Sequence, residues 1–432
     1  MGTSLAFHYI FAAIGVGLPA LLVIVEGLWL RTKDPTYYRL ARTWSRALLL
    51  LFAIGAVSGT TLSFELGLLW PEFMRHAGAV IGVPFSAEGF AFFIEAIFVG
   101  IYLYGWERLA PFQHWLCSLP IALSGALSAA FVTAVNAWMN TPAGFDVVRG
   151  AVTDVRPLEA IFNPAMPTEV VHTTLSAYVF TGFATAAAYG VTLLREPGNR
   201  YAAKGLRVAM LLGAVAIPLQ LVAGDVSARF DAHVEPIKLA AMEGQFRTER
   251  GAALQIGGIP DPAAHQTRYA LRIPYLLSVL SFEDPHAVVR GLDAFPAKDE
   301  PPALPVHLCF DAMVGSGTLL LLIAAWWAYG TKLGLRPPGR RLAQSIALSG
   351  VLAFVAMEAG WMVTEEGRQP WVAVGFLRTA DAVTSAPALD VTFYGFTILY
   401  VFLAITLAFL LLRIRTDEKS DPPRRGPAPA LS

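Results

Sequence analysis

Residues 343–371 read AQSIALSGVLAFVAMEAGWMVTEEGRQPW. The apolar part of this stretch is long enough to cross a membrane, yet it ends in two adjacent carboxylates, Glu365 and Glu366, which are followed by Arg368 and Pro370. A carboxylate at the end of a membrane helix is unfavourable unless it is paired, titrates or binds a ligand. Glu365 is therefore the first candidate functional residue.

The rest of the chain has the composition of an integral membrane protein. Its 432 residues are 55% hydrophobic and 15% charged, which is more apolar and less charged than ordinary soluble domains. A helix needs about 20 apolar residues to cross a bilayer. Stretches of that kind are found near residues 5–30, 47–69, 87–107, 113–138, 169–194, 205–224, 306–330, 343–364 and 390–414. The sequence therefore predicts an all-α integral membrane protein with nine transmembrane helices.

These spans divide the chain into four predicted parts. Helices one to six occupy residues 1–224, and helices seven to nine occupy residues 306–414. Between them, residues 225–305 form a long connection that mixes charge, proline and short apolar runs, and connections of this length are usually functional or disordered. The tail, residues 415–432, is rich in proline and charge and is predicted to be disordered.

Basic residues gather on one side of the predicted membrane. They are concentrated in the connections at 31–46, 195–207 and 331–342 and in the tail. By the positive-inside rule, the N-terminus lies outside, the C-terminus is cytoplasmic and the long connection is extracytoplasmic. The whole chain has 32 basic and 32 acidic side chains. This balance argues against a nucleic acid partner, because phosphate binding requires a basic surface.

Three further side chains would lie in the same membrane layer as Glu365. His8 is within the first apolar stretch, His172 opens the fifth, and Met313 is in the first turns of the seventh. Taken singly, a histidine of this kind is more often a capping or core residue, and a methionine is more often core filler. Together they are heme ligand types. A His–Met pair gives a six-coordinate electron-transfer heme, whereas a single His or Glu leaves a position open for O₂.

The third and eighth spans add acidic and aromatic candidates. Glu88 and Glu95 are seven residues apart, which places them on one helix face about 10.5 Å from each other. Two carboxylates on one face suggest a proton relay, although Glu88 could instead cap its helix. Trp361 lies on the same side as Glu365, where it could pack between macrocycles or belong to the interfacial aromatic belt.

At these residues the chain resembles subunit I of the cytochrome bd family of quinol oxidases. The most specific run is GRQPW at 367–371, preceded by Gly360, Trp361 and Glu365. The similarity covers nearly the whole chain. Supporting matches are Phe7, His8, Glu88, Glu95, 98–100, 105–109, 136–139 and 313–315.

The resemblance implies a set of heme ligands. His172 and Met313 would bind a low-spin heme b. His8 and Glu365 would each bind one of two high-spin hemes, one of them a heme b and the other a heme d or a third heme b. Which ligand takes which high-spin heme stays open.

The resemblance also implies roles around the hemes. Glu88 and Glu95 would belong to the high-spin heme pocket and its proton path. Trp361 would lie between hemes, and Arg368 would be a propionate partner or a structural partner. His114 aligns with a polar residue near the hemes, and a cytoplasmic-loop histidine is the alternative.

The long connection resembles the quinol loop of the family, with KLAAME at 238–243 as the matching segment. Quinol loses two protons with its two electrons, so Glu243 would accept a proton while Lys238 orients a quinol oxygen. The alternative is a solvated amphipathic helix with an intrahelical ion pair. The loop is short for the family, similar to the type that includes cyanide-insensitive oxidases.

The implied protein is a quinol:O₂ oxidoreductase, a cytochrome bd-type ubiquinol or menaquinol oxidase in the bacterial inner membrane. It would oxidise quinol at the outer face, reduce O₂ to water and generate a proton motive force. Its expected partner is subunit II, and a small single-span subunit is left open. The alternatives are a quinol-linked heme subunit without oxidase activity and a secondary transporter with intramembrane carboxylates.

Two positions depart from the family pattern. Asp311 stands two residues before Met313, where many members carry arginine, and Glu65 stands in the segment that is usually a glutamine-rich run. These differences indicate a divergent branch, although every proposed heme ligand is present.

Overall fold

The computed structural model describes residues 2–149, 151–387 and 389–420. Within these residues, nine helices are long and apolar enough to cross a membrane. They are α1 (Gly2–Thr32), α2 (Pro35–Leu69), α3 (Pro71–Gly105), α4 (Pro111–Asn140), α6 (Met166–Arg195), α7 (Arg200–Val234), α10 (Ala303–Thr331), α11 (Arg340–Gly367) and α13 (Leu389–Ser420). The predicted helical membrane fold is confirmed.

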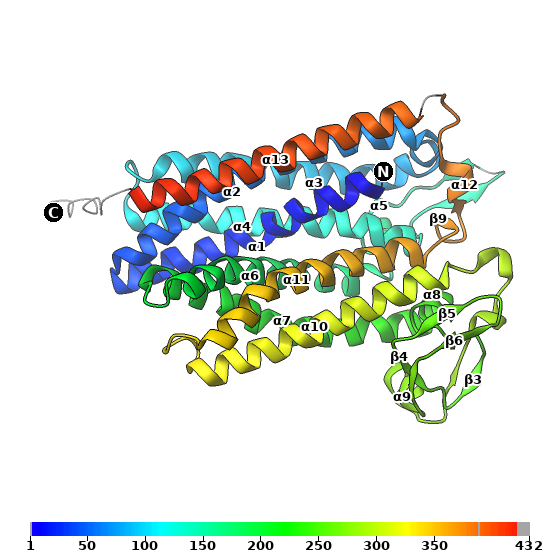
Figure 1. The fold of residues 1–432 in the computed structure, drawn as a ribbon. Coiled ribbons are helices and arrows are strands. Elements are labelled where there is room, and N and C mark those ends of the chain that lie inside the picture. The colour runs from blue at the N-terminus through cyan, green and yellow to red at the C-terminus, as the bar shows by residue number, and fades with distance from the viewer. Residues whose placement is uncertain (1, 150, 388, 421–432) are drawn as a thin grey trace.

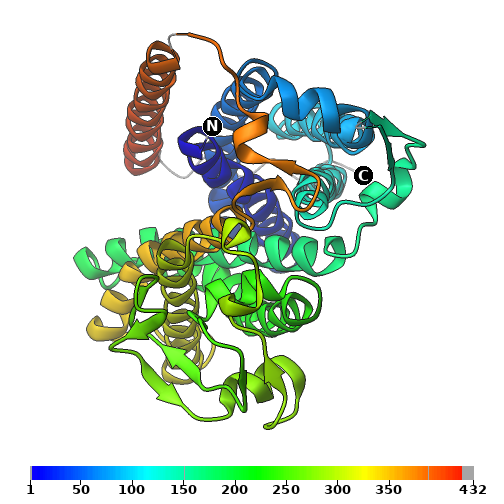
Figure 2. The ribbon, with the colours of Figure 1, turned by 90° about the vertical axis from the view of Figure 1, so that its right-hand side faces the viewer.

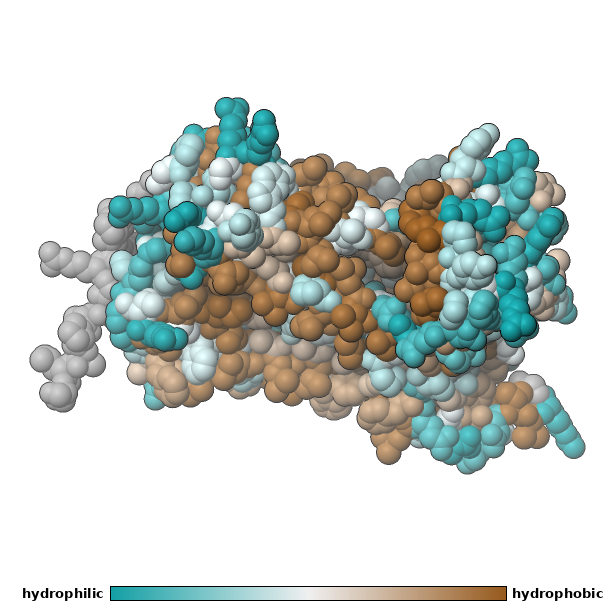
Figure 3. All heavy atoms as spheres, turned by 90° about the horizontal axis from the view of Figure 1, so that it is seen from below, coloured by the Kyte–Doolittle hydropathy of each residue, from teal (hydrophilic) through white to brown (hydrophobic). Residues whose placement is uncertain are grey.

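The long helices run side by side, and successive helices connect at alternate ends of the bundle (Figure 1). A band of apolar residues covers the middle of the molecule, and hydrophilic residues gather at its two ends (Figure 3). This arrangement follows from the bilayer, because helices satisfy their own backbone hydrogen bonds where water is absent.

Short polar connections define the helix starts. The Asp34 side chain accepts a hydrogen bond from the backbone N–H of Thr36, and Pro35 occupies the first position of α2. The Asn199 side chain accepts in the same way from Ala202 at the start of α7. Both features are typical of helix N-termini, because the side chain satisfies a backbone donor and proline has none to lose.

Two groups of helices form the core. The helices α6, α7, α10 and α11 share one cluster of buried side chains, and α1 to α4 share a second. A methyl group at Gly182 of α6 would lie 2.7 Å from the backbone nitrogen of Gly213 in α7, so these two helices approach at glycine. At the periphery, α13 packs against α2 and α1 (Figure 2).

Short strands and helices form an extramembrane layer at one end of the bundle (Figure 2). The connection between α7 and α10 contributes α8 (Pro236–Met242), α9 (Leu276–Phe282) and six short strands. The strands are β3 (Glu249–Arg250), β4 (Leu254–Ile256), β5 (Ile259–Asp261), β6 (Gln266–Arg268), β7 (Leu271–Ile273) and β8 (Val288–Val289). They form antiparallel pairs, β3 with β8, β4 with β7 and β5 with β6.

Two further connections lie at the same end. Strands β1 (Asp146–Val148) and β2 (Ala151–Thr153) and helix α5 (Pro157–Ile161) join α4 to α6. Strands β9 (Trp371–Ala373) and β10 (Leu377–Arg378) and helix α12 (Thr379–Ala382) follow α11. The GRQPW segment therefore leads directly from a membrane helix into this layer.

The predicted boundaries shift at three places. Helix α7 continues to Val234, so the long connection begins at 235 rather than 225. Most of the predicted connection at 31–46 belongs to α2. Helix α13 continues to Ser420, into the predicted disordered tail, and the rest of that tail lies outside the described residues.

Candidate functional site

The four proposed iron ligands come from four different helices. His8 is in the second turn of α1, His172 in the second turn of α6, Met313 in the third turn of α10, and Glu365 in the last turn of α11. At 1.5 Å per residue, Met313 is about 15 Å from the start of its helix. All four therefore lie toward the end of the bundle that carries the extramembrane layer.

His8 is held in a form that suits a metal ligand. Its Nδ1 lies 2.9 Å from the Ser58 hydroxyl, which itself donates to the carbonyl oxygen of Ile54 at 3.0 Å. The hydroxyl therefore accepts from Nδ1–H, and Nε2 keeps its lone pair. A methyl group at Gly59 would lie 3.0 Å from the imidazole Cε1, so glycine makes room beside the ring.

His172 and Met313 also lie beside glycines of neighbouring helices. A methyl group at Gly224 of α7 would lie 3.3 Å from His172 Cε1, and one at Gly360 of α11 would lie 2.9 Å from Met313 Sδ. The Gln220 side-chain nitrogen is 3.1 Å from Nε2 and 3.3 Å from Nδ1 of His172. The backbone around both candidate ligands is thus kept free of bulk.

Glu365 is anchored through both carboxylate oxygens. Oε1 accepts a hydrogen bond of 2.7 Å from the Asn136 side chain, and Oε2 is paired with Arg368. Arg368 is 5% exposed, and its Nε and Nη1 atoms are buried without a hydrogen-bond partner among the described residues. A buried guanidinium with unused donors suits an additional anion such as a heme propionate.

The other candidates of the heme region also face the interior. The Ser128 hydroxyl donates to Glu88 Oε1 at 3.2 Å. Glu95 is 5% exposed and lies beside Gly125 of α4, where a methyl group would be 3.4 Å from both carboxylate oxygens. Trp361 is half-buried and follows Gly360, the glycine that contacts Met313. Because Glu88 is in the fifth turn of α3, the alternative that it caps the helix is wrong.

Lys238 and Glu243, the predicted quinol residues, are both buried at the base of the extramembrane layer. Lys238 Nζ lies 3.2 Å from Glu235 and 3.5 Å from Asp231. Burial disfavours the charged lysine, but these carboxylates outweigh it and raise the pKa of Lys238. Glu243 Oε2 has no hydrogen-bond partner among the described residues, and burial together with the charge of Asp311 raises the pKa of Glu243 to about 8.

Lys238 and Glu243, which were predicted to act as a pair, therefore have different interaction partners. Lys238 belongs to a buried ion-pair cluster that sequence reasoning missed, because Asp231 lies on the part of α7 that the prediction assigned to a loop. The alternative of a solvated helix with an intrahelical ion pair is wrong, since α8 is largely buried and Lys238 pairs with Glu235 and Asp231, which precede the helix.

His114 lies at the opposite end of the bundle from the ligand layer. Its Nδ1 is 2.6 Å from Glu26 Oε1, its Nε2 is 2.8 Å from the Tyr102 carbonyl oxygen, and the Tyr102 hydroxyl donates to Glu26 Oε2 at 2.7 Å. The eighteen residues from His8 to Glu26 span about 27 Å along α1. Both predictions for His114 are therefore wrong: it is neither in a loop nor beside the proposed ligands.

Glu65 lies in a third polar cluster. It is fully buried and accepts hydrogen bonds from the hydroxyls of Ser4, at 2.7 Å, and Tyr400, at 3.3 Å. It therefore joins α1, α2 and α13.

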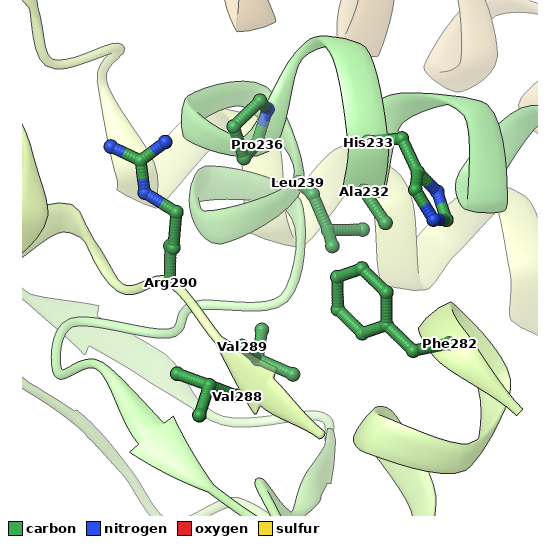
Figure 4. A pocket seen from close by; sticks show the side chains of 8 residues that line it. All are labelled: Ala232, His233, Pro236, Leu239, Phe282, Val288, Val289 and Arg290. Carbon is green, nitrogen blue, oxygen red and sulfur yellow. The ribbon is translucent and has the colours of Figure 1, made fainter. Parts of the chain in front are cut away.

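A pocket of about 300 Å³ opens within the extramembrane layer (Figure 4). Its walls combine apolar side chains with one histidine and one arginine. They are Ala232, His233, Pro236, Leu239, Phe282, Val288, Val289 and Arg290. Neither predicted quinol residue lines it.

Taken together, the fold and the site define a class. The described helices make this an integral membrane protein, and imidazole, thioether and carboxylate side chains lie toward one end of the bundle beside a buried arginine with unpartnered nitrogens, a set of groups that could hold hemes.

Residues 1–419 match the sequence model of the family described as cytochrome bd terminal oxidase subunit I, and the chain belongs to this family. It is 38% identical over 418 residues to the putative cytochrome bd menaquinol oxidase subunit I of Bacillus subtilis (strain 168), covering 95% of this chain and 94% of that protein. It is 29% identical over 447 residues to the cytochrome bd-II ubiquinol oxidase subunit 1 of Escherichia coli (strain K12), covering 87% of each.

The fold is similar to a solved structure as well. The bd oxidase from Geobacillus thermodenitrificans superposes with a TM-score of 0.91 at 38% sequence identity, covering 98% of this chain and 97% of that one. The resemblance seen in the sequence is confirmed.

The Glu26–His114 pair gives a test of the bundle's stability. Replacing Glu26 with leucine leaves the buried Tyr102 hydroxyl and His114 Nδ1 without their hydrogen-bond partner, and each buried polar group left unpaired costs about 1–3 kcal/mol. We expect the thermal midpoint of the purified complex to fall clearly. The control is Glu159→Leu, which removes an exposed partner of Arg156 and should cost at most about 1 kcal/mol. Equal midpoints for the two variants would contradict this assignment.

Proposed function

We propose that this chain is the heme-bearing subunit of a terminal respiratory oxidase that oxidises quinol and reduces O₂ to water. Family membership supports the oxidase activity, and hemes are the cofactors expected for the family. The observation that carries the site assignment is the ligand layer itself. His8, His172, Met313 and Glu365 lie toward one end of the bundle, and the first three pack closely against glycines of neighbouring helices.

The four candidate ligands would bind three hemes. His172 and Met313 would hold a low-spin heme b, and His8 and Glu365 would each hold a high-spin heme, one of them a heme b and the other a heme d or a third heme b. When bound, these groups supply electron transfer and the open iron position that O₂ reduction requires.

Neighbouring side chains would orient the ligands. Ser58 accepts a hydrogen bond from Nδ1–H of His8 and would leave Nε2 free to bind the heme iron, because hydrogen bonds to the other ring nitrogen commonly orient metal-binding histidines. Asn136 fixes one oxygen of Glu365. Arg368 would donate N–H groups from its two unpartnered nitrogens, Nε and Nη1, to a propionate, and Trp361 would pack between macrocycles.

Carboxylates would carry protons in both half-reactions, quinol oxidation and O₂ reduction. Quinol loses two protons and two electrons, and Glu243 would accept the first of these protons at Oε2 while Lys238 orients the quinol. Glu88 and Glu95 would hold protons that arrive from the cytoplasm for water formation. Release of the quinol protons outside and uptake of these protons inside would generate a proton motive force.

The chain is part of a multi-subunit complex, which implies a subunit II. A small single-span subunit is a further proposed partner. We place the complex in the bacterial inner membrane with the basic helix ends in the cytoplasm. Its substrates would be O₂ and either ubiquinol or menaquinol, and assays with both quinols will separate them.

The central test is spectroscopy of the purified complex. Reduced-minus-oxidised spectra should show low-spin and high-spin heme signals, and a pyridine hemochrome assay should count and type the hemes. A complex that oxidises quinol without any heme signal would overturn the proposal.

Met313→Leu tests the low-spin heme site. Leucine preserves an apolar side chain of similar size but has no sulfur ligand, so the six-coordinate low-spin signal should disappear while the high-spin signals remain. Met357→Leu, a buried change on the facing helix α11, is the control and should leave all signals in place. A low-spin signal that survives Met313→Leu would remove this residue from the ligand set.

Glu243 predicts a pH dependence of quinol oxidation. A proton-accepting carboxylate works in its deprotonated form, so activity should rise with pH through the raised pKa of about 8. Asp311→Asn removes a negative charge that favours the protonated form of Glu243. The rise in activity with pH should therefore move to lower pH in this variant. Glu243→Gln should slow quinol oxidation strongly with heme content unchanged. If Glu243→Gln keeps both the parent rate of quinol oxidation and the rise of that rate with pH, Glu243 is not the proton acceptor.

A further inference from the structure

His307 is a fully buried histidine that has no part in the function proposed above. It lies in the second turn of α10, six residues before Met313 on the same helix. On its other side it faces the quinol loop, at the end of α8 and at the turn between β4 and β5. The imidazole therefore connects the segment with the proposed quinol residues to α10, the helix that carries the proposed heme ligand Met313.

Both ring nitrogens of His307 face backbone carbonyl oxygens. Nδ1 lies 2.7 Å from the oxygen of Met242, and Nε2 lies 3.2 Å from the oxygen of Gly257. A carbonyl oxygen only accepts hydrogen bonds, so the ring donates to both of them only as the imidazolium. Asp311 Oδ2, one turn further along α10, lies 3.3 Å from Nε2 and supplies the opposite charge.

These contacts hold the backbone around Glu243 from both sides. Its neighbour Met242 is bound by His307, while the carbonyl oxygen of Gly244 accepts hydrogen bonds from Thr267 at 2.8 Å and Gln255 at 3.1 Å. Gly244 has a positive φ of 59°, and a methyl group there would lie 3.3 Å from His307 Nδ1 and 2.5 Å from the Thr267 hydroxyl. The segment is therefore packed closely against the imidazole, with no room for a side chain.

We propose that His307 is a positioning residue for quinol oxidation, an imidazolium that fastens the quinol loop to α10 and thereby fixes Glu243 relative to the helix that carries Met313. The inference rests on the proposed role of Glu243. The strength of the attachment comes from charge and burial, because a hydrogen bond from a charged donor is stronger than one between neutral groups, and more so in a buried site.

Without the imidazolium, the carbonyl oxygens of Met242 and Gly257 would lose a hydrogen-bond donor in the protein interior. The loop would then shift, and a displacement of about 1 Å at a reacting group lowers rates by up to about 100-fold. The hemes should stay bound, because none of the proposed iron ligands is among these hydrogen-bonded partners.

The test uses the purified complex with three variants. His307→Phe keeps a planar ring without donors, and His307→Gln keeps two N–H donors on one nitrogen without a charge. His286→Gln, at an exposed histidine of the same extramembrane layer, is the matched control. Steady-state assays give KM and kcat for quinol, and anaerobic stopped-flow gives the rate at which quinol, or dithionite as a bypass, reduces the hemes.

We expect His307→Phe to slow heme reduction by quinol at least 10-fold and to raise KM, with dithionite reduction and heme content unchanged. His307→Gln should recover part of the loss, and His286→Gln should match the parent protein. The proposal is overturned if both His307 variants reduce with quinol within twofold of the parent protein, or if both lose quinol activity only in step with heme. A parent complex without heme or quinol oxidation would instead overturn the proposed function.

Discussion

The absence of water inside the bilayer is the constraint on which the rest of this structure depends. Every polar group placed there must find a partner within the protein, because an unpaired one costs several kcal/mol. The chain meets this requirement in discrete clusters, such as Glu26 with His114 and Glu65 with Ser4 and Tyr400. Each cluster ties together helices that are distant in sequence, so polar contacts determine much of the helix arrangement.

The same constraint gives meaning to the groups that remain without partners. Two nitrogens of Arg368 and one oxygen of Glu243 are buried and lack a hydrogen bond among the described residues. Arg368 lies beside the proposed ligand Glu365, and Glu243 lies in the segment that resembles the quinol loop. In the proposed function, these are the two positions that would receive a heme propionate and a quinol.

The amino-acid sequence predicts the membrane helices well, because continuous apolar runs have few alternative structures. It fails at 225–234, where charged residues suggested a loop while α7 continues. That extension is stabilised by ion pairs, including Asp225 with Arg229 and Asp231 with Lys238. Only the second of these pairs reaches another helix, and no local pattern reveals it.

The candidate ligands could be found from residue type and membrane depth, but their supporting partners could not. Ser58 is 50 residues from His8, and Asn136 is 229 residues from Glu365. His307 is 65 residues from Met242, and the two meet only because the connection between α7 and α10 folds against α10. Such contacts depend on tertiary packing, which hydropathy and spacing do not describe.

Gly59, Gly224 and Gly360 are positions where a substitution would act on a candidate ligand indirectly. Each stands on a helix other than that of its ligand, and each contributes space rather than an interaction. A side chain at any of them would push directly on His8, His172 or Met313. If these side chains hold iron as proposed, the sites would depend partly on positions that touch no metal and carry no functional group, and a survey restricted to reactive residues would overlook them.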